Sequence, residues 1–232
     1  MDVSTAMGTP SHGDITRDVI EAKGTAGSAT AAGKCDLRTR AELRTYADRM
    51  PWIRTIAPED ATDRLAELYG WQSAALGRPT EFTQLGSLDA EVVNARLVLY
   101  KASEGVASSL TPRQKQLIAY LTSILNSTPH CASLSRAQLD GELVRVLDAR
   151  DYGALDEVDA AIARYVETLT LRPGEVTEAD VDALRAVGLD DLSILDANNQ
   201  CAHLNYTNRV ANGLGLFHDA ILEERSLDRV PR

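Results

Sequence analysis

TPRQKQLIAYLTSILNSTPHC, residues 111–131, is the stretch that decides the fold of this 232-residue chain. Thr111 is a typical helix N-cap, Pro112 is tolerated at the first helical position, and Gln114 stands where a capping box needs Glu or Gln. The apolar residues that follow recur at helical spacing: Leu117, Ile118, Leu121 and Leu125. Pro129 should interrupt this helix and begin another, with Cys131 in its first turn. The stretch therefore predicts two consecutive helices.

The chain on either side of this stretch has the same helical character. Apolar residues between 155 and 169 step by three and four positions, as on one face of an amphipathic helix. The segments 57–69, 87–100 and 177–187 each begin with capping residues and continue with apolar residues at helical spacing, and Gly188 is placed to end the last of them. No alternating run is bounded by turn residues, so strands are not expected. The pattern predicts an all-α protein.

The first part of the chain differs from the rest. Residues 22–33 carry almost no bulky side chains, so they cannot bury enough area to offset the entropy lost on ordering. We predict a flexible leader over residues 1–45, with an arm ordered against a partner subunit as the alternative. An all-α domain then spans residues 46–232. It divides near residue 108 into an N-terminal helical part, 46–108, and a part that carries the candidate site, 109–232.

Composition excludes several classes of function. The formal net charge of −10 repels phosphate backbones and anionic lipid, so we expect no nucleic-acid or membrane partner. No apolar run approaches the roughly 20 residues that a membrane span needs, and the chain shows no secretion signal. The three cysteines, Cys35, Cys131 and Cys201, are too few for a disulfide framework. These features predict a cytoplasmic protein with reduced thiols.

Candidate chemistry centres on the neighbours His130 and Cys131. A helix N-terminus and an imidazole both favour a thiolate, which gives Cys131 two reasons to have a pKa below its usual value of about 8.5. The alternative is an inert core cysteine beside a helix-cap histidine. His203 lies among recurring polar residues in a helix that either lines a pocket or carries a structural hydrogen-bond network. No metal-ligand spacing or phosphate-binding loop is present, so we expect neither metal nor cofactor.

Further polar residues follow His203. We predict that Asn205, Asn208 and Arg209 form a buried polar network that fixes the C-terminal helix. Arg209 has an alternative role, since its planar guanidinium also suits a substrate carboxylate. Cys201 is predicted to be a core residue, and Cys35 to be exposed.

Residues 111–119, running on to His130 and Cys131, resemble the active-site helix pair of the alkylhydroperoxidase D-like family, within the carboxymuconolactone decarboxylase superfamily. Three flanking segments are similar to parts of its peroxidase-related members: 53–69 to their first helix, 171–189 to their linker and following helix, and 205–215 to their C-terminal signature. The resemblance implies an alkylhydroperoxidase-like helical bundle that assembles as a homo-oligomer.

The peroxidatic pattern of that family contains a glutamate, a Cys-x-x-Cys pair and a following histidine. Laid on this chain, these positions hold Gln116, Thr128, Cys131 and Ser135, and the histidine that often precedes the second cysteine is kept as His130. Thr128 cannot form a disulfide, and Gln116 cannot accept a proton at neutral pH. The resemblance therefore implies one thiol in an altered polar pocket.

Three functions are compatible with these residues. In the first, the protein is a one-cysteine thiol oxidoreductase: Cys131 attacks a hydroperoxide, and an external thiol, Cys201 or Cys131 of another subunit resolves the product. In the second, it is a repurposed cofactor-free isomerase, lyase or decarboxylase that acts on a small organic acid, with His130 as acid or base and His203 in reserve. The third is a non-catalytic relative that binds a small molecule or a partner subunit. In the enzymatic hypotheses Gln116, Thr128, Ser135 and His203 line the pocket.

Overall fold

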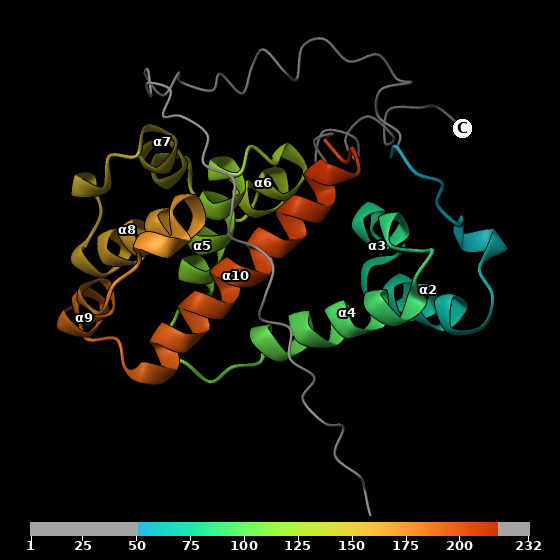
Figure 1. The fold of residues 1–232 in the computed structure, drawn as a ribbon, viewed down its shortest axis with the longest axis horizontal. Helices are drawn as coiled ribbons and strands as arrows, with labels where there is room; N and C mark the ends of the chain where they lie inside the picture. The colour runs from blue at the N-terminus through green and yellow to red at the C-terminus, as the bar shows by residue number, and fades with distance from the viewer. Residues whose placement is uncertain (1–50, 218–232) are drawn as a thin grey trace, which may run out of the picture. The chain divides into compact units, whose positions relative to one another are not determined.

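The structure, a computed structural model, describes residues 51–217, so the predicted leader, Cys35 and His218 lie outside the described residues. Within this range all regular secondary structure is helical, which confirms the predicted all-α fold class (Figure 1). The α-helices are α2 (Asp63–Leu76), α3 (Glu81–Leu85), α4 (Ala90–Glu104), α5 (Pro112–Leu125), α6 (Pro129–Arg136), α7 (Gly141–Ala149), α8 (Glu157–Leu171), α9 (Glu178–Ala186) and α10 (Asp191–Gly213). Short 3-10 helices cover η2 (Pro58–Asp60), η3 (Tyr152–Ala154) and η4 (Pro173–Glu175). None of the helices between residues 51 and 217 is both long and apolar enough to cross a membrane.

Helix α5 begins as its sequence predicts and lies in the centre of the main core. The Thr111 hydroxyl accepts a hydrogen bond from the Gln114 backbone N–H at 3.2 Å, and the Gln114 side chain accepts one from the Thr111 N–H at 3.0 Å. Leu117, Ile118 and Leu121 are completely buried. The helix packs against α6, α8 and α10, the last of which crosses it obliquely (Figure 1).

Two features of the N-terminal helical part differ from the prediction. The single helix expected over residues 57–69 is instead η2 followed by α2, because Ala61 and Thr62 between them adopt extended backbone with ψ of 137° and 165°. The five-residue helix α3 was not predicted, since it is too short to show a period, although Thr80 caps it through a hydrogen bond to the Thr83 N–H. Helix α4, with Asp89 as its N-cap, begins within the predicted segment 87–100.

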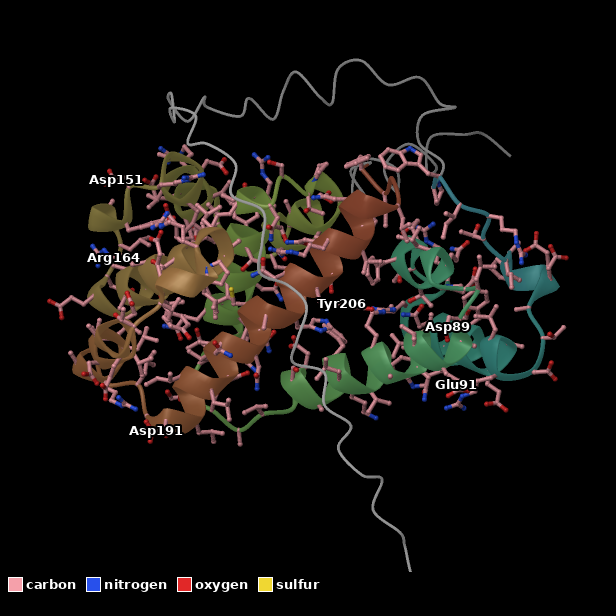
Figure 2. The ribbon with its side chains drawn as sticks, viewed as in Figure 1. Asp89, Glu91, Asp151, Arg164, Asp191 and Tyr206 are labelled. Atoms are coloured by element: carbon pink, nitrogen blue, oxygen red, sulfur yellow. The ribbon has the colours of Figure 1, made fainter. Side chains whose placement is uncertain are left out.

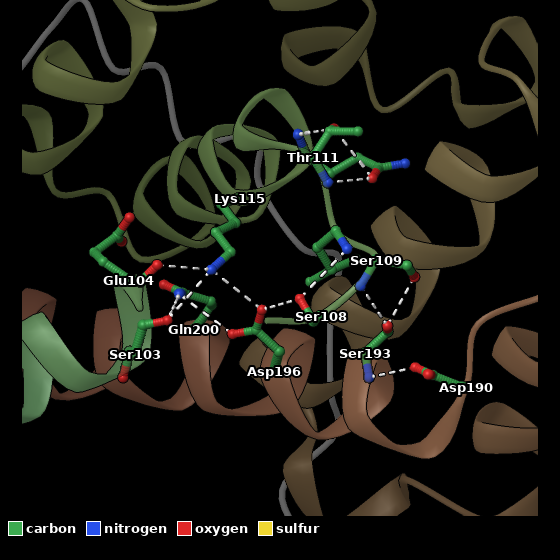
Figure 3. Close-up of polar contacts among 12 residues, drawn as sticks. Ser103, Glu104, Ser108, Ser109, Thr111, Lys115, Asp190, Ser193, Asp196 and Gln200 are labelled. Atoms are coloured by element: carbon green, nitrogen blue, oxygen red, sulfur yellow. Dashed lines mark hydrogen bonds and ion pairs between the residues drawn. The ribbon is translucent and has the colours of Figure 1, made fainter. Parts of the chain in front are cut away.

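A buried ion pair joins α5 to α10. Lys115 Nζ lies 3.2 Å from the Asp196 carboxylate, and the side chains are 9% and 0% exposed (Figure 3). Ser108 donates to the same carboxylate at 2.5 Å, and Lys115 also donates to the Ser103 carbonyl oxygen at the end of α4. The Gln200 side chain donates to that carbonyl oxygen from α10. This network fixes the end of α4 against α10.

The predicted polar network at the C-terminal end of the domain is present. The Asn205 side chain accepts from Asn126 on the α5–α6 loop at 2.9 Å and donates to Thr170 of α8 at 3.2 Å. Asn208 is fully buried and accepts from a serine hydroxyl of α5. Arg209 departs from the prediction of a buried network: it is exposed, so its charge stays in solvent, and it donates to the Asn205 carbonyl oxygen one turn earlier in α10. These contacts confirm that the asparagines fix α10 against its neighbours.

Candidate functional site

Cys131 occupies the first turn of α6, as the sequence predicts. The helix begins at Pro129, and the Cys131 side chain is buried, with 7% of the residue exposed, and forms no disulfide. Thr128 and Ser135 stand three residues before and four residues after it, so helical geometry places them on the same side of α6. Both are buried. The thiol therefore lies at an interior, partly polar face of the helix.

The ionisation of Cys131 differs from the expectation. Burial raises the pKa of its thiol to about 12, and the positive charge of Arg96 offsets only part of that increase. The predicted lowering by the helix N-terminus and His130 is therefore wrong for this structure, because removing a thiolate from water costs more than the helix dipole returns. At neutral pH Cys131 is a protonated thiol.

Arg96, on α4, was not identified from the sequence. Its Nη2 donates to the Thr83 hydroxyl at 2.8 Å, and its guanidinium carbon lies 4.6 Å from the centre of the Phe82 ring. Burial lowers the pKa of Arg96 to about 10, while the negative forms of Tyr206 and Cys131 would raise it. No carboxylate between residues 51 and 217 forms an ion pair with Arg96.

His203 faces the same arginine from α10. Only 8% of the residue is exposed, its ring centre lies 6.0 Å from that of Tyr100, and its buried Nδ1 has no hydrogen-bond partner in the described part of the chain. Burial, and secondarily the charge of Arg96, lowers the pKa of His203, so the imidazole is neutral at neutral pH. Tyr206, labelled on α10 in Figure 2, lies one turn beyond His203 and is partly exposed. We call Arg96, Tyr100, Cys131, His203 and Tyr206 the Arg96 site.

The other predicted pocket residues are less clearly connected to this site. His130 is 2% exposed, directly before Cys131 in α6. Gln116 is half-buried on α5 and makes no side-chain hydrogen bond within residues 51–217. Cys201 is completely buried, as predicted, with its sulfur 3.4 Å from the Thr170 hydroxyl, and burial raises the pKa of its thiol. The structure therefore places Cys131 and His203 each within electrostatic range of Arg96, and places Cys201 in the core.

Neither a metal cluster nor the cavity between α8 and α9 coincides with the Arg96 site. Among residues 51–217, no three His, Cys, Asp or Glu side chains are grouped to hold a metal ion. A cavity of about 590 Å³ opens between α8 and α9, where Tyr152, Arg164, Tyr165 and several alanines line it. It contains no thiol or imidazole, so it offers none of the chemistry predicted from the sequence.

Comparisons with solved structures identify the fold of the chain. No family model and no curated protein matches the chain. A peroxidase-related protein from Silicibacter sp. TM1040 is similar in structure at a TM-score of 0.61 and 22% identity, over 72% of this chain and 93% of that one. An alkylhydroperoxidase core protein from Ralstonia eutropha JMP134, also peroxidase-related, gives a TM-score of 0.63 and 20% identity over 78% and 98%. The chain has the alkylhydroperoxidase-like fold.

The alkylhydroperoxidase-like fold also includes a protein with a different activity. The debrominase Bmp8 is similar to this chain at a TM-score of 0.58 and 16% identity, over 75% of this chain and 95% of the debrominase. A cysteine-to-alanine variant of that debrominase has been solved in complex with 2,3,4-tribromopyrrole. Similarity at this level of identity establishes the common fold, and the activity of this chain has to be argued from its own site.

Proposed function

We propose that this protein is a peroxidase-related thiol oxidoreductase that works with one cysteine, Cys131. The observation that carries the proposal is that one cation, Arg96, lies near enough to a thiol, Cys131, and to a neutral imidazole, His203, for its charge to lower the pKa of both. A thiol can reduce a peroxide only as a thiolate, so the site needs a base that is unprotonated at neutral pH. The lowered pKa of His203 supports it in that role. Structural similarity to peroxidase-related proteins supports the reaction class.

The reaction begins with transfer of the Cys131 proton to His203. The sulfur then attacks one oxygen of the hydroperoxide: the S–O bond forms, the O–O bond breaks, and the leaving alkoxide takes the proton from the imidazolium to become an alcohol. Cys131 is oxidised to a sulfenic acid, and the peroxide is reduced. An external thiol attacks the sulfenic sulfur and releases water, and a second external thiol attacks the mixed disulfide and regenerates Cys131. We assign the reduction to external thiols because Cys201 is enclosed in the core.

Sulfenic-acid trapping tests this proposal directly. The full chain is treated briefly with a small organic hydroperoxide and a sulfenic-acid trap, and each cysteine is then assayed by mass spectrometry. We expect an adduct on Cys131 whose rate of formation falls in His203→Gln, while Cys35→Ser, which removes a cysteine outside the described residues, leaves that rate unchanged. Absence of the adduct from folded protein would rule out the thiol mechanism.

A second candidate function is favoured by the high pKa of Cys131. A thiol with a pKa of about 12 stays protonated at neutral pH and is not a nucleophile there. Acid–base chemistry on a small organic acid, as in a cofactor-free isomerase, lyase or decarboxylase, would then fall to a histidine. The sequence hypothesis made His130 the acid or base of such an enzyme. Under this alternative His130→Gln abolishes turnover of the acid while Cys131→Ser retains some. The opposite pattern supports the thiol oxidoreductase.

A further inference from the structure

Arg96 differs from the other arginines between residues 51 and 217 because it is partly buried and has no ion pair. Four more arginines of that range form no ion pair, but they are exposed: Arg54, Arg136, Arg164 and Arg209. Seven exposed arginines between residues 51 and 217 form an ion pair with a carboxylate: Arg64, Arg78, Arg113, Arg145, Arg150, Arg172 and Arg185. Arg96 is less exposed than these and has no such partner in that range, although the chain carries an excess of ten acidic charges. A partly desolvated cation without a counterion is costly, so its retention at this position needs a reason.

The environment of Arg96 holds its guanidinium in place without neutralising it. Thr83, which accepts its only hydrogen bond within the described residues, also accepts one from the Thr80 hydroxyl at 3.0 Å. The Phe82 ring covers one side of the guanidinium at 4.6 Å. The other guanidinium nitrogens of Arg96 make no hydrogen bond within the described residues, and none of them is fully buried. They therefore remain in contact with solvent. Donors are thus available to a ligand from solvent.

The surroundings of these donors are aromatic. Arg96 and Tyr100 are four residues apart on α4 and share one face of that helix. The Tyr100 ring contacts His203, whose buried Nδ1 makes no hydrogen bond in the described part of the chain. The exposed fractions of Tyr100 and Tyr206, 47% and 44%, leave ring surface accessible beside the arginine. A ligand on Arg96 would therefore meet aromatic rings and an unpartnered imidazole nitrogen.

We propose that Arg96 binds a carboxylate of the substrate, and that this substrate is a hydroperoxide of a small aromatic carboxylate. A planar guanidinium pairs with the two oxygens of one carboxylate, and a single cation neutralises a monoanion but not a phosphate dianion. The accessible rings of Tyr100 and Tyr206 account for the aromatic body. The inference rests on the proposed function in one respect: it assigns the substrate class of the site in which Cys131 reacts.

Binding of benzoate, with benzamide as the uncharged control, tests the inference without any turnover. Titration is followed by the imidazole C–H resonance of His203, which His203→Gln identifies among the four histidines. We expect saturable binding of benzoate, no comparable effect of benzamide, and affinity about ten- to a hundredfold weaker in Arg96→Met. Arg164→Met removes an arginine that lines the cavity between α8 and α9 and should leave the affinity unchanged.

The outcomes separate this inference from the proposed function. Equal effects of benzoate and benzamide, or loss of binding in Arg164→Met and not in Arg96→Met, would overturn the carboxylate assignment. If Arg96→Met does not fold, Arg96→Lys replaces it: it keeps the charge without the planar fork, and we expect weaker benzoate binding there as well. Sulfenic-acid trapping on Cys131 without benzoate binding refutes only this inference. Benzoate binding without trapping refutes only the thiol mechanism.

Discussion

Alkylation of Cys131 in the folded protein should be very slow at neutral pH, because only the thiolate reacts with an alkylating reagent. Burial raises the pKa of Cys131 to about 12. At pH 7 its thiolate fraction is then about 10⁻⁵, against about 3% for an unfolded thiol with a pKa near 8.5. We therefore expect native alkylation to be roughly 10³- to 10⁴-fold slower than alkylation of the unfolded chain.

The assay is iodoacetamide labelling from about pH 6 to 10, quenched at intervals and quantified for each cysteine by mass spectrometry, with protein in guanidinium chloride as the unfolded reference. The native rate at Cys131 should rise tenfold for each unit of pH across the whole range. Labelling through transient unfolding would instead level off above about pH 9, where unfolded thiols are already ionised. A plateau near pH 9, or a neutral-pH rate within tenfold of the unfolded reference, would refute the conclusion that burial controls Cys131.

Three further predictions concern stability and can be measured by urea denaturation. Lys115→Met leaves Asp196 buried without its counterion and should lower the free energy of unfolding by about 3–5 kcal/mol. The double variant Lys115→Met with Asp196→Leu should recover most of that loss. Equal losses in the single and the double variant would argue against the ion pair. Gly215→Ala places a methyl group 2.8 Å from the Trp52 ring at a φ of +85°, whereas Gly188→Ala, at +94°, meets no atom within 4 Å. Gly215→Ala should therefore lose more than the ~1 kcal/mol or more expected of Gly188→Ala from backbone strain alone. Finally, the thiol of Cys131 is protonated in both the folded and the unfolded state below about pH 8.5. As pH rises from there towards 12, the unfolded thiol ionises while the folded thiol does not, so the folded state loses stability. By pH 10.5 the free energy of unfolding of the wild type should have fallen by about 2–3 kcal/mol relative to Cys131→Ala.

Helices could be predicted from sequence where local chemistry marks their ends. Thr111 and Thr177 open capping boxes in the structure, and the predicted interruption at Pro129 separates α5 from α6. The prediction over residues 57–69 failed because periodicity does not report the backbone angles of two residues within an apolar pattern. Helix α3 escaped because five residues span little more than one turn, too few for a period to be visible.

The position of the candidate thiol was predictable, and its ionisation was not. Local features place Cys131 at a helix start, but its pKa depends on how completely distant helices exclude water, which is a property of tertiary packing. Arg96 was missed for a related reason: an arginine in an apolar helix segment has the same local pattern whether it faces solvent or a site. The sequence does show that Arg96 and Tyr100 are four residues apart, on one face of α4. This spacing indicates a site only when the packing of α10, which places His203 against Tyr100, is known.

The single charge of Arg96 sets a further condition on the proposed chemistry. In the free protein this charge lowers the pKa of the Cys131 thiol, in partial opposition to burial. A substrate carboxylate bound to Arg96 neutralises the same charge, so the thiolate becomes harder to form while the substrate is present. By thermodynamic reciprocity, ionisation of Cys131 must weaken carboxylate binding to the same extent. Arg96 therefore stabilises the thiolate less while it holds the substrate than it does in the free protein.

The proton of Cys131 then has to pass to a base, and His203 is the imidazole that shares the Arg96 site. The pKa of His203 is lowered from its usual value of about 6.5, so its imidazole is unprotonated at neutral pH and can accept a proton there. Turnover of a carboxylate-bearing hydroperoxide should accordingly be constant near pH 7 and fall on acidification only below about pH 6.5, when His203 takes up a proton from solvent. His203→Gln should remove this acid limb along with most of the rate. An acid limb that persists unchanged in folded His203→Gln would show that another group takes the proton, because a glutamine side chain cannot accept it.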